Sequence, residues 1–267
     1  KVETMEDVEA SSGVISGTFL IFGGFIMAAG FLLIITIISF LYSSVGHGGA
    51  SGYIALMTIF SFSLLEIRPT ALILNIIVSG ISFVLFNKYS HFRWNLFYPF
   101  AISSIPFSFI GGSIQLENNM YKVFLALLLI FSIFRIIFLS EQKPKNILKN
   151  NFVISLLIGS IIGFFSGLIG IGGGIILSPI IIILNWGTMK QAAATSALFI
   201  FFNSISGFFG YYLNDGFIPF EKLIIVPFVI FGAIIGSFYG SNKLSNYILS
   251  YFLVIVLFLA SIKLLLL

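Results

Sequence analysis

The feature that most constrains this chain is the absence of Asp, Glu, Lys and Arg from residues 10–65. As a single α-helix, that stretch would be about 84 Å long at 1.5 Å per residue. The hydrocarbon core of a bilayer is ~30 Å thick, and about 20 apolar residues cross it. The stretch is therefore predicted to fold back inside a membrane. The uncharged stretch 150–189 is also predicted to fold back, because as a single helix it would be about 60 Å long.

Composition also favours a membrane protein. Charged residues make up 8% of the 267 residues and hydrophobic residues 59%, whereas a soluble domain carries about 25% charged residues. The apolar excess is expected to face lipid. Cysteine is absent, which excludes disulfides, thiolate nucleophiles and cysteine metal sites. The acidic residues 1–10 argue against a signal peptide, which begins with positive charge.

Glycines mark the points at which the two long stretches are expected to break, at residues 45–52 and 169–174. Glycine is a poor helix former and permits backbone shapes that other residues resist. A shift of 124 residues superposes the glycines, with Gly46, Gly48 and Gly49 falling on Gly170, Gly172 and Gly173. The sequence therefore predicts an internal repeat, with chance recurrence of glycine-rich apolar sequence as the alternative.

Each half shows the same order of elements. A short apolar helix, predicted at 53–64 and at 175–186, leads to a turn with a cation, then to a long helix with polar residues and two further apolar helices. This gives five segments per half and about ten in all. An odd number per half makes the second half enter from the opposite side, as in many secondary transporters. We expect an all-α polytopic membrane protein built from two inverted repeats of five helical segments.

The repeat also sets the domain bounds. They are an acidic tail and the start of the first membrane helix at 1–24, a first repeat at 25–140, a basic loop at 141–150 and a second repeat at 151–267.

The basic loop sets the expected orientation. Lys143, Lys145 and Lys149 outnumber Glu141 there, and the positive-inside rule places such a loop in the cytoplasm. Counting crossings puts further cations on the same side, namely Lys88, Arg93, Arg135, Lys190 and Lys243. We expect a multi-pass membrane protein with the loop 141–149 in the cytoplasm and both termini outside.

The glycine breaks are also the candidate binding site. Backbone groups freed inside a bilayer need protein, a cavity or a ligand as partner, and a helix N-terminus favours anions. Two such termini from opposite sides could converge on one anion, whereas close helix packing is the plainer use of the glycines. The candidate substrate-binding residues are Gly46, His47, Gly48, Gly49, Ser51, Asn75, Gly170, Gly172, Gly173, Gly174, Thr195, Ser196 and Asn203.

His47 is the one titratable side chain in either break, and Ile171 holds its place in the second. It could bind an anion as imidazolium or carry a coupled proton. A neutral histidine bonded to a neighbouring helix is the alternative.

Polar and basic residues of the long helices are further candidates. Asn75, Thr195, Ser196 and Asn203 are expected to face the bundle interior, where interhelical hydrogen bonds are the plainer role. Arg68 and Lys190 start corresponding helices on opposite membrane faces. They could act at the two entrances or simply anchor helix ends at the interface.

Nothing in the sequence indicates an enzyme. No acidic pair lies in a membrane segment, and the two histidines are far apart. The Gly-x-Gly-Gly-Gly string lacks a P-loop lysine and a βαβ context. We expect no cofactor, no metal and no nucleic-acid partner.

The glycine motifs resemble the TauE/SafE sulfite-exporter family, also called TSUP. The resemblance is carried by Ser44–Tyr53 and Gly167–Pro179, together with Arg68–Asn75 and Ala192–Ser204, and covers roughly residues 25–267. It implies a bacterial cytoplasmic-membrane exporter or permease for sulfite, sulfonates or related sulfur oxyanions. The first repeat departs from the plain Gly-x-Gly-Gly-Gly pattern at His47 and Ala50.

We therefore expect a secondary transporter that exports a small sulfur-containing anion, such as sulfite or an organosulfonate, by alternating access around the two glycine breaks. Protons are a candidate coupling ion, beside the substrate gradient and the membrane potential. An anion channel is one alternative. A non-transport assembly or sensor protein is the other.

Overall fold

The computed structural model describes residues 27–117, 119–121, 123–124, 126–127, 130, 134, 147–242 and 258. Regular structure in this part of the chain is helical throughout, and six helices are long and apolar enough to cross a membrane. They are Met27–Ser44, α3 (Leu64–Lys88), α4 (Trp94–Ser113), α6 (Phe152–Ile169), α8 (Met189–Asp215) and α9 (Val226–Asn242), the last preceded by the 3-10 turn η1 (Phe220–Ile225). The predicted all-α membrane protein is confirmed.

The predicted count of ten segments reaches beyond this part of the chain. The crossings expected at 123–140 and 244–262 lie largely outside the described residues, as do the acidic tail 1–24 and most of the basic loop 141–150. The number of segments and their inverted relation stay predictions.

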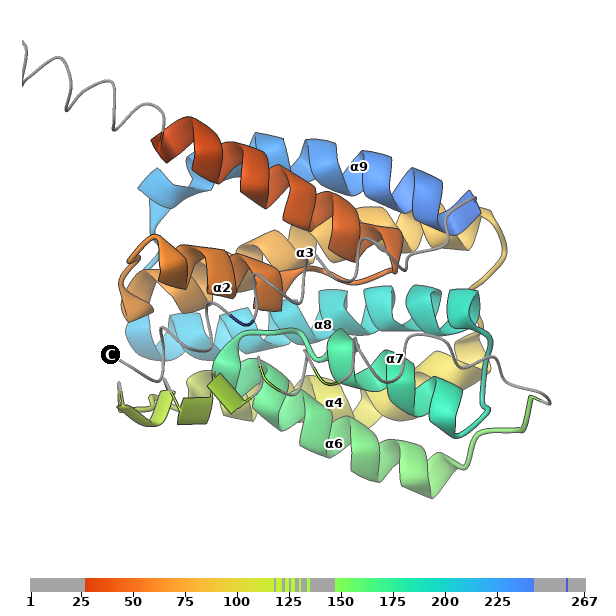
Figure 1. The fold of residues 1–267 in the computed structure, drawn as a ribbon. Coiled ribbons are helices and arrows are strands. Elements are labelled where there is room, and N and C mark those ends of the chain that lie inside the picture. The colour runs from red at the N-terminus through yellow and green to blue at the C-terminus, as the bar shows by residue number, and fades with distance from the viewer. Residues whose placement is uncertain are drawn as a thin grey trace, which may run out of the picture.

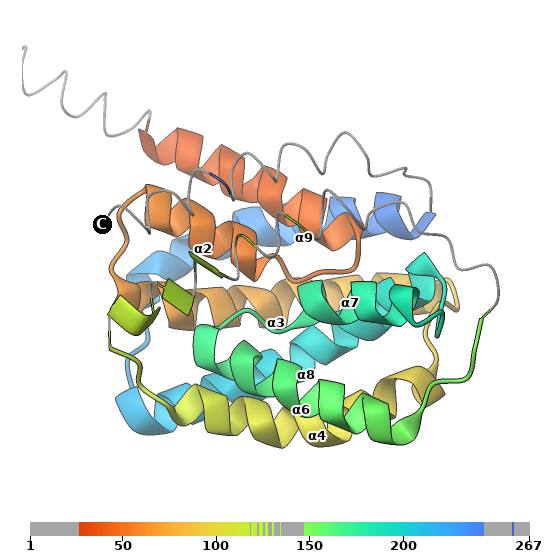
Figure 2. The same ribbon diagram turned by 60° about the horizontal axis from the view of Figure 1, so that its bottom comes forward.

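Two short helices, α2 (Ala50–Ile59) and α7 (Gly174–Ile183), follow the glycines. Each begins directly after a glycine in the left-handed region, Gly49 with φ of 93° and Gly173 with φ of 76°. We call the connecting residues 45–49 and 170–173 the first and second glycine segments. Figures 1 and 2 show α2 and α7 running in opposite directions away from the middle of the bundle.

The predicted bounds of the first short helix, 53–64, were wrong. Helix α2 starts three residues earlier, so Ser51 and Gly52 are helical, and the chain turns at Ser61, whose φ is 61°. Gly52 allows close packing here, because a Cβ at this position would lie 2.7 Å from the Tyr42 ring. The second short helix was predicted at 175–186 and ends earlier, at Ile183.

Helices α3 and α8 form the centre of the bundle. Helix α3 contacts α2, α8 and α9, and α8 contacts α4, α6 and α7 as well. The two run in opposite directions between the two ends of the molecule (Figure 1).

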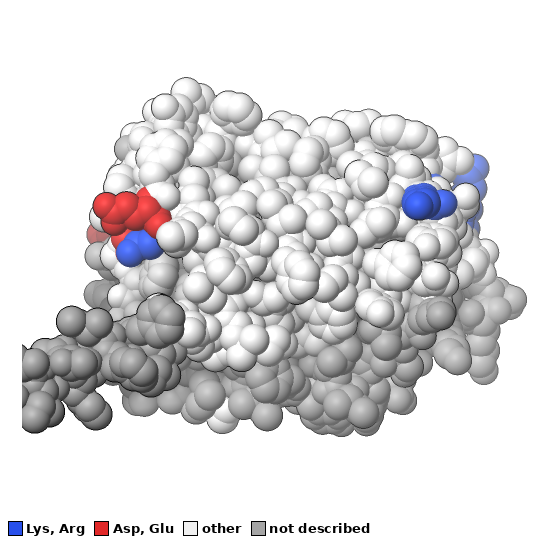
Figure 3. Space-filling view, turned by 90° about the horizontal axis from the view of Figure 1, so that it is seen from above, with Lys and Arg blue, Asp and Glu red and all other residues white. Residues whose placement is uncertain are grey.

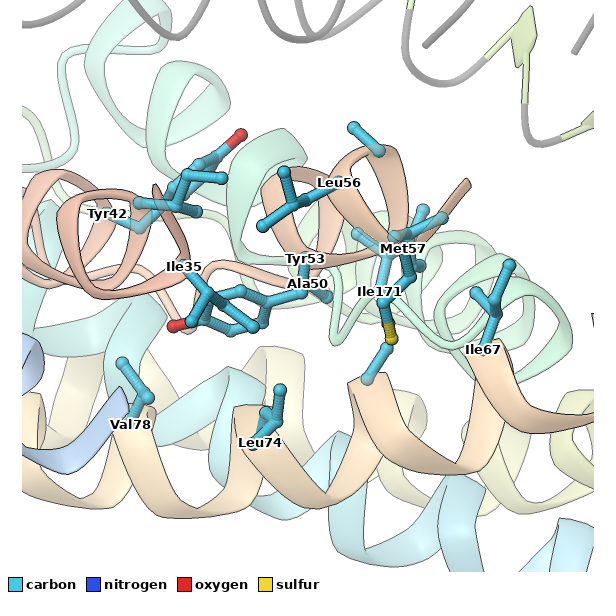
Figure 4. Packing of buried hydrophobic residues seen from close by; sticks show 14 of the residues in the cluster. Ile35, Tyr42, Ala50, Tyr53, Leu56, Met57, Ile67, Leu74, Val78 and Ile171 are labelled. Atoms are coloured by element: carbon cyan, nitrogen blue, oxygen red, sulfur yellow. The ribbon is translucent and has the colours of Figure 1, made fainter. Parts of the chain in front are cut away.

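Helix α2 is enclosed by protein. Its residues from Ala50 to Thr58 are all buried, which is typical of a helix that is apolar all round and surrounded by other elements. Figure 4 shows side chains of α2, among them Tyr53 and Met57, between those of the helix Met27–Ser44 and α3. Ile171 of the second glycine segment belongs to the same cluster. The two halves of the chain therefore share one apolar core.

Small residues let two pairs of helices approach closely. Glycines spaced by four residues on α6 pack on backbone carbonyls of α4, and glycines spaced by four on α9 pack on those of the helix Met27–Ser44. Such seams are common between membrane helices, because small residues let backbones come close. The glycines are Gly159, Gly163 and Gly167 of α6 and Gly232, Gly236 and Gly240 of α9.

Charged side chains gather at the two ends of the molecule. On the face drawn in Figure 3, an uncharged band lies between an end with both acidic and basic groups and an end with basic groups. Lys222 pairs with Glu66 at 3.4 Å. At the other end, Asn150 donates to the Asn95 carbonyl and the Leu148 N–H to the Asn185 carbonyl, which brings residues 147–151 to the start of α4 and the end of α7. The uncharged band fits a bilayer core.

Candidate functional site

Asn75, at the middle of α3, lies between the two glycine segments. A Cβ at Gly48 would overlap the Asn75 Oδ1 atom and lie 2.9 Å from its Cγ. A Cβ at Gly172 would lie 2.8 Å from Asn75 Nδ2. Both segments need glycine here because the Asn75 carboxamide occupies the space that a side chain would fill. One fully buried amide thus contacts the break in each half.

The hydrogen bonds of Asn75 fix the orientation of its amide. The Ala50 N–H, at the start of α2, donates to Asn75 Oδ1 at 3.1 Å. A backbone N–H can only donate, so the atom facing it is the oxygen. The amide nitrogen therefore points towards Gly172, and it has no hydrogen-bond partner among the described residues. A buried donor without a partner is costly and calls for an explanation such as a ligand.

One face of α8 completes the wall around this amide. A Cβ at Gly172 would lie 2.9 Å from the Ser204 Oγ atom, and a Cβ at Gly174 would lie 3.5 Å from the Ser196 Cβ. Residues four apart share a helix face, which aligns these serines with Ile200 between them. The hydroxyls of Ser196 and Ser204 are fully buried and lack partners within the described part of the chain.

His47 joins the first glycine segment to α7. Its Nε2 atom lies 2.7 Å from the Ser178 Oγ atom, and its Nδ1 atom lies 2.9 Å from the Val45 carbonyl oxygen. The Ser178 hydroxyl also bonds the Gly174 carbonyl at 2.8 Å. The predicted alternative of a hydrogen bond to a neighbouring helix is observed, and it does not exclude titration.

Arg68 is buried beside the ends of two helices, and its role at an entrance stays a prediction. It is 6% exposed, and its guanidinium donates to the carbonyls of Gly111, Gly112 and Ile114 near the end of α4 and of Gly167 near the end of α6. It also lies 5.3 Å from the centre of the Tyr211 ring. Basic side chains are favourable at the negative ends of helices. No pattern in the sequence indicates that two such helix ends meet at one cation.

Lys190, the corresponding cation of the second half, also bonds a carbonyl near the end of a helix. It is exposed, and its Nζ atom donates to the Ser241 carbonyl near the end of α9 at 3.0 Å. Arg68 thus bonds the end of α4, and Lys190 bonds the end of α9.

The other predicted residues divide into two groups. Gly46 packs on the Ala193 backbone of α8 and Gly170 on Arg68, so these two glycines serve close packing between the halves. Gly173 packs on Ile162 and Phe199 within the second half. Gly49 packs on the Tyr53 ring, and Ser51 bonds the Tyr42 hydroxyl at 2.6 Å.

Asn203 is buried in the bundle interior, as expected from the sequence. Its amide donates to the Phe199 carbonyl of its own helix, and Ser108 of α4 donates to its backbone oxygen. Asn203 is therefore engaged in the packing of α4 on α8. Thr195 is fully buried on α8.

Comparison with known proteins identifies the family. The model described as "Sulfite exporter TauE/SafE" matches residues 31–264. The chain belongs to the TauE/SafE family. It is 36% identical over 234 residues to the "Probable membrane transporter protein y4hK" of Sinorhizobium fredii, covering 82% of this chain and 92% of that protein. No solved structure matches it.

Two further relatives share less of their sequence with this chain. One is the "Probable membrane transporter protein YunE" of Bacillus subtilis, 25% identical over 186 residues, which is 62% of this chain and 68% of that protein. The other is a "Probable membrane transporter protein" of Methanocaldococcus jannaschii, 28% identical over 173 residues, which is 60% of this chain and 64% of that protein. The resemblance inferred from the glycine motifs is confirmed, and this TauE/SafE chain is a multi-pass membrane protein of a transporter family.

Sequence reasoning missed three residues of the candidate site. Ser204 and Ile200 contact the glycine segments, and Ser178 bonds His47. The spacing of four from Ser196 to Ile200 and to Ser204 could have indicated a shared face. The bond from His47 to Ser178 had no sequence signal, because it joins residues 131 apart.

Proposed function

We propose that this TauE/SafE protein is a secondary transporter that exports a small sulfur-containing anion, bound between the two glycine segments. The observation that carries the proposal is Asn75, which contacts both segments and directs a buried amide donor without a described partner at the second. Amide N–H and hydroxyl groups donate hydrogen bonds, and the oxygen atoms of an oxyanion can accept them. The positive ends of α2 and α7, both at these segments, favour negative charge further.

The burial of this site favours a carrier over an open pore. Asn75, Ser196 and Ser204 are each 0% exposed. An anion can therefore reach their donors only if helices move, as alternating access requires. An open channel would instead leave the polar groups that line its pore in contact with water.

Several pairs of features support two inverted halves, which are part of the proposal. Helices α2 and α7 have ten residues each and start 124 residues apart, at Ala50 and Gly174. The two cations Arg68 and Lys190 bond the ends of α4 and α9. Rocking of one half against the other would then open the site to alternate sides.

We infer the orientation from the charged ends. The end with Lys88, Arg93, Lys149 and Lys190 is proposed to lie in the cytoplasm, by the positive-inside rule. The end with the Lys222–Glu66 pair then lies outside the inner membrane.

The deciding experiment is counterflow in proteoliposomes loaded with unlabelled sulfite, following entry of labelled sulfite. Sulfate, thiosulfate, taurine and sulfoacetate serve as competitors, and empty liposomes as the control. Saturable accumulation that depends on the protein supports a carrier, and the order of competition names the substrate class. Conductance above carrier rates without counterflow would instead identify a channel. Folded, reconstituted protein that moves none of these anions would refute the proposal.

A further inference from the structure

The central helices α3 and α8 correspond under a shift of 125 residues, close to the shift of 124 that superposes the glycines. Their N-caps, Ser63 and Thr188, lie that far apart, and each forms a capping box. The same shift places Asn75 of α3 on Ile200 of α8. Corresponding positions of the two proposed halves therefore hold an amide in the first half and a branched aliphatic side chain in the second.

Asn75 and Ile200 each contact both glycine segments. A Cβ at Gly48 would overlap the Asn75 Oδ1 atom and lie 2.9 Å from the Ile200 Cγ2 atom. A Cβ at Gly172 would lie 2.8 Å from Asn75 Nδ2 and 2.6 Å from the same Cγ2 atom. The two side chains are 0% and 2% exposed. They therefore border the candidate site together, one from α3 and one from α8.

The donors at this point of the site come from Asn75 and Ser204. The Ser204 Oγ atom would lie 2.9 Å from a Cβ at Gly172, so two donors and the Ile200 methyl group converge beside this glycine. Both donors lack a hydrogen-bond partner among the described residues. Ser79 corresponds to Ser204 under the same shift, but its hydroxyl already donates to the Asn75 carbonyl at 2.5 Å. The site is therefore polar at Asn75 and Ser204 and apolar at Ile200.

This arrangement discriminates between two kinds of sulfur oxyanion. Sulfate has four oxygens, and an oxygen that is buried against an aliphatic group without a donor costs free energy. A sulfonate has a carbon substituent in place of one oxygen. That carbon needs no hydrogen bond and gains from contact with apolar surface. Its three oxygens lie on the opposite side, where they can accept from side-chain donors and from free N–H groups at the start of a helix.

We propose that Ile200 determines specificity and selects an organosulfonate, with the carbon substituent against Ile200 and the sulfonate oxygens towards Asn75, Ser204 and the start of α7. This inference rests on the proposed function and narrows its sulfur-containing anion to one class. An inorganic sulfur oxyanion would direct an oxygen at the Ile200 methyl group, in a site that is closed to water. It therefore binds more weakly than a sulfonate of the same size.

The test compares methanesulfonate with sulfate, which have the same tetrahedral shape and differ by a methyl group in place of an oxygen. Each competes with labelled methanesulfonate in counterflow near neutral pH, where both anions are fully ionised, with empty liposomes as the baseline. The wild type should bind methanesulfonate at least about tenfold more tightly than sulfate, because one charged oxygen would lack a donor.

Variants of Ile200 separate the effect of this side chain from the charge of the anions. Ile200→Asn repeats the residue of the first half and supplies a donor, so the preference ratio should fall by at least about tenfold. The same two anions are compared in two proteins, so their difference in charge cancels from this change. Ile200→Val is the matched control. It keeps the Cγ2 methyl that faces Gly48 and Gly172 and removes Cδ1, which faces Gly174.

The ratio in Ile200→Val should stay within about fourfold of the wild type, the effect of one buried methylene. Where Ile200→Asn does not fold, Ile200→Thr carries the polar test, because it exchanges one methyl of Ile200→Val for a hydroxyl and should lower the ratio in the same direction. Thermal unfolding in detergent reports whether each variant is folded.

A wild type that binds sulfate as tightly as methanesulfonate would overturn the role of Ile200 and leave the transporter standing. So would counterflow of sulfite without counterflow of methanesulfonate, or a folded Ile200→Asn variant with the wild-type ratio. Folded, reconstituted protein that moves neither sulfite, sulfate nor any sulfonate would instead refute the proposed function.

Discussion

Gly48→Ala adds one methyl group where the Asn75 amide lies. Gly48 is not among the glycines with positive φ, so alanine meets no backbone strain there. Its Cβ would overlap Asn75 Oδ1, which accepts the Ala50 N–H. Loss of that bond and overpacking together should lower the free energy of unfolding by about 2–4 kcal/mol. Loss of one donor to a charged ligand, about 1.5–3 kcal/mol, should weaken anion affinity roughly 10- to 150-fold.

The assay is the concentration dependence of counterflow, with thermal unfolding in detergent as the measure of folding. Gly30→Ala is the matched control, because a Cβ there would meet no described atom within 4 Å. It should leave both transport and stability close to the wild type. If Gly48→Ala acts by displacing Asn75, it should add little to the loss caused by Asn75→Ala in the double variant. Affinity losses that multiply in the double variant would refute the reasoning.

Three predictions concern stability, each measured by thermal unfolding in detergent. Arg68→Met should lower the free energy of unfolding by about 3–5 kcal/mol, because four carbonyls lose a buried cation; an unfolding temperature equal to the wild type would contradict this. Lys222→Ala should cost less than about 1 kcal/mol, because its pair with Glu66 is partly exposed; a loss as large as that at Arg68 would count against this. Gly163→Leu should separate α6 from α4 at the Ser104 backbone, costing at least about 1–3 kcal/mol; a neutral effect would show that the seam is loose.

The contrast between Arg68 and Lys222 shows why the position of a cation along the sequence says little about its role. Both stand near the ends of membrane helices, where the plain expectation is a side chain that reaches to the interface. Lys222 remains partly exposed beside Glu66. Arg68 is buried because the ends of α4 and α6 offer it four carbonyls. Those helix ends are 43 to 99 residues away along the chain.

The sequence by itself determined that the chain is a helical membrane protein and which family it belongs to. These conclusions follow from local quantities, namely the length of uncharged stretches, glycines that superpose under a fixed shift, and the motifs around them. It also indicated Asn75 and Ser196 as polar residues that face the interior. Bilayer thickness and the cost of exposed backbone act on every segment alone, so they can be read without a fold.

Only the tertiary structure decided which of these residues meet. It brought Asn75 to both glycine segments, placed Ser204 beside Gly172, and joined His47 to Ser178 across 131 residues. It also started α2 at Ala50, since Gly52 packs within a helix against Tyr42. The physical reason is that a hydrogen bond or a close contact depends on the distance between two chain segments, which the pattern of either segment alone does not contain.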